Sequence, residues 1–441
     1  MPFRTIPGAE TQYGLICFDS NGEERPDPDG RGGVMSQRLL ETAAGEDITN
    51  IFLFSHGWMG DVPAAVNQYD RWIHAFDALG VDRDKATRFF PGFRPLFIGL
   101  HWPSLPWGDE ELSDTSFAAG EEALGPNALY RLYLDRLGDT PAVRSALRSI
   151  LEEARRNVEP DHLSAKARDA FLDLNQALEL GSDGVGGAPD ADREPFDPDA
   201  AFENSDVAFG GFDVFGGILG LLRLCSYWSM KKRARGVGES GMHDYVNSLQ
   251  RVTAKRGVRI HLMGHSFGCI VISSILGGPQ GAGPLERPID SVVLAQGAVS
   301  LWSYASEIPI AGAGPGYFHR IIPSGRVRGP LITTQSRYDT AVGRIYPRAS
   351  AVSGEISFVA ESFPKYGAIG TFGLQGLPGE VRTDSSMLSV TGEYGFERGK
   401  VYNLEASQFI SHGTGSSGAH NDIDGPEVAH AIWQAAFTSA S

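Results

Sequence analysis

Short, uninterrupted apolar runs recur toward both ends of this chain of 441 residues. Most are continuous rather than alternating in hydrophobicity, which is typical of strands buried on both faces of a parallel sheet. Helical patterns lie between them, for example at residues 68–79 and 243–255 and from Pro426 onward. Strands alternating with helices predict βαβ units, and so an α/β fold whose mainly parallel sheet is covered by helices. The runs are residues 14–18, 50–54, 95–100, 258–263, 291–295, 330–334 and 400–404.

The alternation stops in the middle of the chain. Residues 142–158 and 163–180 are rich in Ala, Leu, Arg and Glu, which predicts two helices. Residues 182–206 are acidic and rich in Gly and Pro, a composition typical of a flexible loop. A Gly-rich apolar segment, residues 209–228, follows this loop.

We interpret residues 106–240 as a cap, or lid, inserted between two strands of the core. The α/β core would then consist of residues 1–105 and 241–441. A chain of this length can hold one large domain and a substantial insertion. The alternative is a separate small helical domain that has no role at the active site.

Composition narrows the classes of partner and the cellular compartment. The formal net charge is −16, from 38 basic and 54 acidic residues, and such a surface repels nucleic acid. The cysteines are Cys17, Cys225 and Cys269, whose spacing fits neither a metal site nor a disulfide framework. The chain starts without an apolar run of signal-peptide length, and Asp213 and Arg223 interrupt its most apolar stretch. We therefore expect a cytoplasmic protein with no transmembrane segment, or one exported without a signal peptide.

A Gly-His-Ser-Phe-Gly motif follows directly on the run 258–263. The apolar residues 269–276 come next and can form a helix, so the motif has the strand–turn–helix context that a serine nucleophile requires. Gly264 and Gly268 flank the serine at positions where the backbone comes too close for side chains. The motif predicts Ser266 as a nucleophile whose helix points its positive end at a developing oxyanion. A buried serine in a Gly-rich turn is the alternative.

The segment after residues 50–54 supplies a candidate oxyanion loop. A tetrahedral intermediate needs two fixed N–H donors, one from the residue after the nucleophile and one from a loop after an earlier strand. Phe267 is the first donor, and Trp58 is our choice for the second. Gly57 would let the backbone approach the substrate, and His56 is expected to brace the loop. A plain glycine turn beside a core tryptophan is the alternative.

An acid is expected after the serine in this type of site, just beyond a strand. Asp339 lies in the loop that follows the run 330–334, where it could orient a histidine. Glu307 is the alternative, but it lies farther from the end of its strand, residues 291–295. We favour Asp339.

Histidines beyond Ser266 are candidates for the base. His319 precedes the acid and breaks the expected order, and His430 lies within the final helical pattern. His412 and His420 both lie in the loop after the run 400–404. We favour His420, because it stands just before the helix that starts at Pro426, whereas His412 lies in a Gly- and Ser-rich stretch.

Together these segments resemble the α/β-hydrolase superfamily, in its lipase- and esterase-like branch, over roughly residues 10–104 and 245–435. The matching residues are His56-Gly57-Trp58, the motif from Gly264 to Gly268, Asp339 and His420. The resemblance implies Ser266 as nucleophile, Asp339 as acid, His420 as base, and neither a metal nor an organic cofactor. This chain departs from the family in having His-Gly-Trp instead of His-Gly-Gly-Gly in the oxyanion loop.

The expected reaction is hydrolysis of a carboxylic ester through an acyl-enzyme on Ser266. The apolar cap segment favours a small-molecule or lipid-like ester with a hydrophobic acyl group, contacted by Leu219 and Leu222. A peptidase or amidase of the same fold is one alternative, and a non-catalytic binding protein that retains the fold is another. A dinucleotide-binding protein is disfavoured, because no G-x-G-x-x-G follows the first strand.

Overall fold

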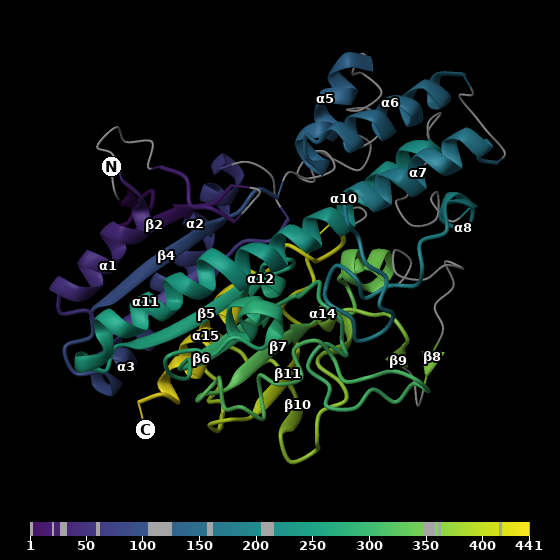
Figure 1. The fold of residues 1–441 in the computed structure, drawn as a ribbon. Helices are drawn as coiled ribbons and strands as arrows, with labels where there is room; N and C mark the ends of the chain where they lie inside the picture. The colour runs from purple at the N-terminus through teal and green to yellow at the C-terminus, as the bar shows by residue number, and fades with distance from the viewer. Residues whose placement is uncertain are drawn as a thin grey trace.

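A sheet of nine strands forms the centre of the molecule (Figure 1). The computed structural model describes residues 3–19, 22–26, 33–58, 62–104, 126–156, 162–203, 216–346, 358–359, 363–413 and 417–440. All neighbouring strands of this sheet are parallel except the pair β1 and β2. In spatial order the strands are β1 (Arg4–Thr5), β2 (Gln12–Cys17), β4 (Pro95–His101), β3 (Asn50–Ser55), β5 (Arg259–His265), β6 (Ser291–Ala295), β7 (Leu331–Gln335), β11 (Val401–Glu405) and β10 (Arg382–Ser386).

The prediction of an α/β fold with a mainly parallel sheet is confirmed. Each apolar run singled out in the sequence lies on a strand of this sheet, and the strands from β3 to β7 are buried along almost their whole length. The sequence did not indicate β10 because this edge strand is polar and largely exposed. A further hairpin, outside the main sheet, pairs β8 (Phe358–Val359) with β9 (Phe363–Pro364).

Helices cover both faces of the sheet and divide the core into two large hydrophobic clusters (Figure 1). One cluster joins the sheet to α1 (Met35–Gly45), α11 (His243–Thr253) and α12 (Gly268–Gly277). The other joins it to α2 (Val62–Asp77), α3 (Gly80–Phe89) and α15 (Pro426–Phe437). Successive side chains of a strand point to opposite faces, which explains why Leu262 belongs to the first cluster and Met263 to the second.

The order of the strands reverses direction between β3 and β5. The chain passes from β3 outward to β4, then returns past β3 to β5 and continues through β6 and β7 on the other side. In open α/β sheets, ligands bind at such a reversal, in the crevice outside the carboxyl ends of the strands. His56-Gly57-Trp58 leaves β3 at this point and Ser266 leaves β5, so both predicted segments lie where the topology favours a site.

Residues inserted after β4 form several helices beyond one end of the sheet, and both chain ends lie toward the other side of the molecule (Figure 1). The helix α10 (Gly216–Val237) continues from this group onto α12, so its second half belongs to the layer that covers the sheet. The predicted boundary at residue 240 therefore falls after a helix that the cap and the core share. The other helices are α5 (Pro126–Leu137), α6 (Pro141–Arg156), α7 (Ala165–Ala177) and α8 (Pro198–Glu203).

The acidic segment, predicted to be a flexible loop at residues 182–206, contains buried charged side chains. Within residues 182–203, Asp190 is buried and receives two hydrogen bonds from Arg235 of α10, at 2.5 and 3.0 Å. Arg193 is also buried and donates to the Asn175 side chain at 2.6 Å. Composition alone could not reveal this, because the groups that satisfy these charges come from distant parts of the chain. Residues 204–206 lie outside the described residues.

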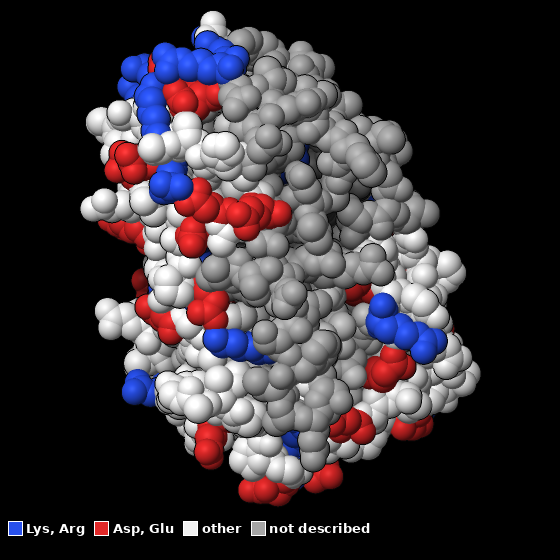
Figure 2. Space-filling view, turned by 90° about the vertical axis from the view of Figure 1, so that its right-hand side faces the viewer, with Lys and Arg blue, Asp and Glu red and all other residues white. Residues whose placement is uncertain are grey.

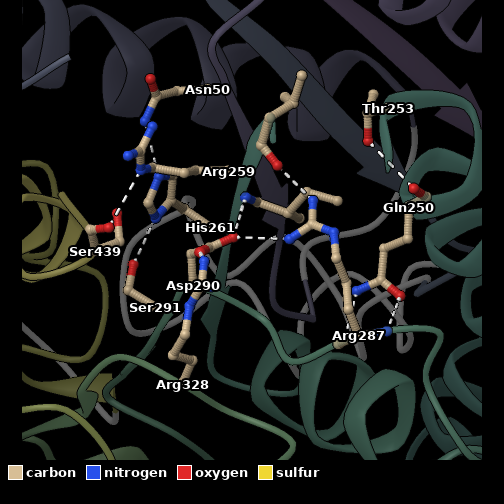
Figure 3. A network of polar contacts seen from close by, with 12 residues as sticks. Asn50, Gln250, Thr253, Arg259, His261, Arg287, Asp290, Ser291, Arg328 and Ser439 are labelled. Carbon is tan, nitrogen blue, oxygen red and sulfur yellow. Dashed lines mark hydrogen bonds and ion pairs between the residues drawn. The ribbon is translucent and has the colours of Figure 1, made fainter. Parts of the chain in front are cut away.

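A polar network links β3, β5 and β6 near their amino ends, on the side of the sheet away from Ser266 (Figure 3). The buried Asp290 carboxylate accepts the Ile260 N–H at 2.8 Å and pairs with Arg287 and Arg328. Beside it, the His261 ring lies 2.8 Å from the Ser291 hydroxyl and 3.1 Å from the Asn50 amide nitrogen. Burial lowers the pKa of His261 to about 4, so this ring is a neutral structural group.

Acidic and basic side chains are interspersed on the coloured part of the face shown in Figure 2, which looks onto the right-hand side of Figure 1. Basic side chains gather at the upper left of this view, with acidic ones beside them, and are scattered over the rest of the coloured part. Within the described ranges, none of the helices combines the length and the apolar composition that a membrane crossing requires.

Candidate active site

Ser266 stands on a sharp turn between a strand and a helix. β5 ends at His265 and α12 begins at Gly268. Ser266 has a left-handed backbone conformation, with φ of +55°, which is uncommon for a residue other than glycine. Its N–H donates to the Ala295 carbonyl at 3.2 Å, which holds the turn against the end of β6. This is the strained strand–turn–helix geometry expected of a nucleophile elbow.

The glycines of the motif lie where the backbone leaves no room for a side chain. A Cβ on Gly268 would lie 2.2 Å from the Ser55 carbonyl oxygen, so this glycine lets α12 start directly against the end of β3. A Cβ on Gly264 would lie 2.6 Å from the Gly268 carbonyl oxygen. On the opposite loop, a Cβ on Gly57 would lie 2.7 Å from Cβ of Ser266. The absence of side chains at these glycines lets residues 56–58 and the start of α12 lie directly against each other beside Ser266.

Ser266, His420 and Asp339 form a continuous hydrogen-bonded chain. His420 Nε2 lies 2.8 Å from Ser266 Oγ, and His420 Nδ1 lies 2.7 Å from Asp339 Oδ2. A carboxylate can only accept, so Nδ1 carries the ring proton and Nε2 accepts from the serine hydroxyl. All three residues are buried or nearly so, with Ser266 exposed by 5% and His420 by 6%. The arrangement could move the hydroxyl proton to the imidazole while the carboxylate stabilises the imidazolium.

The alternatives weighed in the sequence do not join this chain. Glu307 is exposed. The His412 side chain is exposed, and its Nδ1 lies 3.3 Å from the carboxylate of Asp422. His319 contacts the Gly316 carbonyl, and His430 is buried in α15 beside Asp82.

Two donors that the sequence did not point to hold the Asp339 carboxylate. The side-chain amide of Gln296 donates to Oδ2 at 3.1 Å, and the Val342 N–H donates to Oδ1 at 3.1 Å. Gln296 directly follows β6, is fully buried and has a φ of +44°. The hydroxyl of the neighbouring Thr334 donates to the Gln296 amide oxygen at 3.1 Å, which orients the amide nitrogen toward Asp339. Gln296 gives no signal in the sequence, because a neutral amide after a strand does not resemble a catalytic acid.

His56 braces the loop between β3 and the candidate site, as the sequence suggested. Its ring contacts the Gly57 carbonyl at 2.6 Å through Nδ1, and its backbone N–H donates to the Tyr69 hydroxyl at 2.7 Å. Its own carbonyl accepts the Trp102 indole N–H at 3.2 Å. Burial lowers the pKa of His56 well below its usual value, as does the neighbouring His101. The ring is therefore neutral and serves as a brace.

An aromatic group surrounds the two predicted oxyanion donors. The Trp58 ring stacks on Phe267 with centroids 5.4 Å apart and planes 15° apart. Tyr227, from α10, contacts both rings edge-on, at 6.1 Å from Trp58 and 5.3 Å from Phe267. Leu219 and Leu222, the residues of α10 proposed from the sequence to contact an acyl group, are buried members of the larger hydrophobic cluster, and their contact with a substrate stays a prediction. The helix therefore reaches the candidate site through Tyr227.

Phe267 has a backbone N–H suited to the predicted role, because it immediately precedes the first turn of α12. The Phe267 N–H makes no hydrogen bond within the described part of the chain. The N–H groups at a helix start have no partner within the helix and favour negative charge.

Within the described ranges, no three His, Cys, Asp or Glu side chains are grouped so as to hold a metal ion. No protein-family model, curated protein or solved structure matches this chain.

Proposed function

We propose that this chain is a serine hydrolase of the α/β-hydrolase superfamily that cleaves a carboxylic ester with a hydrophobic acyl group. One observation carries the proposal: Ser266, His420 and Asp339 lie in hydrogen-bonded sequence at 2.8 and 2.7 Å, with the serine on a left-handed turn. This constellation and the chain order Ser, Asp, His are those of the superfamily. The parallel sheet with its reversal of strand order at the site further supports the assignment.

In the proposed reaction, His420 Nε2 takes the hydroxyl proton as Ser266 Oγ attacks the ester carbonyl carbon. The N–H groups of Phe267 and Trp58 stabilise the oxyanion that forms. The bond to the alcohol oxygen then breaks, and His420 returns its proton to the leaving alcohol. Water attacks the acyl-enzyme in the same way, releases the carboxylic acid and restores the serine hydroxyl.

The surroundings of the serine favour an apolar substrate. Trp58, Phe267 and Tyr227 form an aromatic cluster around the loop and the turn that carry the proposed oxyanion donors, and each methylene of an acyl group that packed against this cluster would contribute about 0.8 kcal/mol. An amidase or peptidase would use the same triad, and a binding protein with this fold would need none of it. Ester hydrolysis is therefore our first assignment.

Covalent labelling tests the proposal before any substrate is known. A fluorophosphonate probe should label the wild-type protein and leave Ser266→Ala unlabelled. Asp339→Ala and His420→Ala should slow labelling by several orders of magnitude, because they remove the base or its orienting carboxylate. His412→Ala is the matched control, since this exposed histidine lies in the same loop and should leave the rate unchanged.

A panel of p-nitrophenyl esters of increasing acyl length, with amide analogues, then tests the substrate class. We expect kcat/KM to rise by roughly fourfold per added methylene until the pocket is filled. Full labelling of Ser266→Ala would overturn the assignment of the nucleophile. Faster turnover of the amides than of the esters would favour the peptidase or amidase reading.

A further inference from the structure

The histidine before the nucleophile contacts the loop that carries the base. His265 Nε2 lies 2.9 Å from the His420 backbone carbonyl, and His265 Nδ1 lies 3.0 Å from the side-chain amide nitrogen of Gln68 in α2. The two imidazole rings have centroids 5.0 Å apart. We propose that Gln68 and His265 together position His420 for catalysis, an inference that rests on the proposed hydrolase function.

The two hydrogen-bond partners of His265 allow only one tautomer of its neutral ring. A carbonyl oxygen can only accept, so the proton is on Nε2 and is donated to His420. Nδ1 then carries the lone pair and accepts from the Gln68 amide. With its single N–H already used, the neutral ring has no proton to exchange with the triad. Gln68 therefore selects the tautomer that can hold the His420 backbone.

The electrostatics of the site keep the two histidines in different roles. Burial, together with the charge that His420 can carry, lowers the pKa of His265 to about 3. His265 consequently stays neutral when His420 takes up the serine proton. One ring can carry the proton of the reaction while its neighbour remains a fixed donor.

The local chain explains why this contact is needed. His420 lies in a loop without regular structure, tied at Ala419, whose N–H donates to the Tyr338 carbonyl at 2.9 Å. His265 points to the same face of the sheet as Met263, two residues earlier, and this face packs against α2 and α15. The strand that supplies the nucleophile thus also supplies a rigid donor for the loop that supplies the base. A shift of about 1 Å in that loop could cost about a hundredfold in rate.

The test separates the donor from the volume of the ring. His265→Leu removes the N–H and should lower kcat, and the rate of fluorophosphonate labelling, by about tenfold to a hundredfold with little change in KM. His265→Gln retains an amide N–H that can reach the His420 carbonyl and should recover most of that loss. Gln68→Leu keeps the His265 ring but removes the amide that fixes its tautomer, so we expect an intermediate loss of kcat.

His261→Leu is the matched control, because His261 is an equally buried, neutral histidine on the same face of β5, bonded to Asn50 and Ser291 instead (Figure 3). It should lower the free energy of unfolding without changing kcat beyond the loss of folded protein. In a plot of kcat against pH, His265→Leu should in addition move the acid limb to lower pH. The reason is that a displaced His420 imidazolium is less well stabilised by Asp339.

Unchanged kcat and an unchanged pH profile in His265→Leu would overturn the inference, as would equal losses in His265→Leu and His261→Leu. Failure of the proposed function looks different: wild-type protein would then not be labelled at Ser266 at all. If labelling depends on Ser266 but His265→Leu reacts at the wild-type rate, only the positioning role is wrong.

Discussion

Gln296 holds the oxygen of Asp339 that also faces His420. Its amide donates to Oδ2 at 3.1 Å, and His420 Nδ1 lies 2.7 Å from the same oxygen. A hydrogen bond to a charged group contributes about 1.5–3 kcal/mol when its partner is buried. Gln296 therefore helps to hold the carboxylate in the position that directs Oδ2 at the imidazole.

Gln296→Met keeps the approximate shape of the side chain and removes the donor. We expect kcat to fall by about tenfold to a hundredfold, because the carboxylate that stabilises the imidazolium is less well held. Steady-state kinetics on the best ester of the panel, together with thermal unfolding, would measure this. A variant with wild-type kcat would show that the Val342 N–H suffices to hold Asp339.

The proposed nucleophile, acid and base could be predicted from the sequence, whereas the neutral side chains that support them could not. Ser266 was indicated by the glycines around it, and Asp339 and His420 by their place after late strands. Gln296 and His265 carry no such signal, because an amide or a neutral imidazole gains its role only from the atoms placed opposite it. Those atoms belong to Asp339 and His420, which are distant in the chain.

At the scale of elements, α3 and α15 are joined by a buried ion pair. His430 Nδ1 lies 2.7 Å from Asp82 Oδ2, and its Nε2 lies 2.8 Å from the Gly392 carbonyl. Burial by itself would lower the pKa of His430, but the hydrogen bonds to Asp82 and Gly392 and the charge on Asp82 outweigh it and raise this pKa. Both ring nitrogens face acceptors, so the imidazolium is the form that fits.

Because the pKa of His430 is raised in the folded state, the pair with Asp82 stabilises the protein most at pH values where this histidine is also protonated in the unfolded chain. The contribution is fully present below the ordinary histidine value of about 6.5 and is lost as pH rises through the higher folded value. Asp82→Asn should therefore flatten the fall in melting temperature above about pH 6.5. His74→Gln, at an exposed histidine of α2, is the control and should leave the slope unchanged. Equal slopes in wild type and Asp82→Asn would refute the role of this pair.

Elements with strong periodicity were predictable, and elements defined by their neighbours were not. The buried strands and the helices α6, α7, α11 and α15 follow apolar patterns in the sequence. The edge strand β10 reads as Arg-Thr-Asp-Ser-Ser and exists because β11 offers it a parallel partner. The acidic segment similarly takes its order from Arg235, which lies outside it.

At the scale of the molecule, the inserted helices and the sheet share one hydrophobic cluster. Phe171 of α7, Leu147 of α6 and Leu53 of β3 all belong to it, and α10 runs through both parts. The alternative of a separate small helical domain would require its own core. A shared core predicts that the insertion and the sheet unfold together.

Phe171→Ala tests this coupling, because Phe171 is fully buried in the insertion. We expect a loss of about 3–5 kcal/mol that appears in one common transition, with the labelled active site and the helices melting at the same temperature. Leu172→Ala, at the exposed neighbouring position, should change stability by no more than about 0.5 kcal/mol. Two separate transitions in calorimetry, with only one shifted by Phe171→Ala, would favour independent domains.

The left-handed backbone at Ser266 is a position where stability and the proposed function make opposite demands. A residue with a side chain costs about 1–2 kcal/mol in that conformation, whereas glycine adopts it freely. Mutation guided only by stability would drift toward glycine at this position. If Ser266 is the nucleophile, its hydroxyl is therefore placed there at the expense of the stability of the fold that carries it.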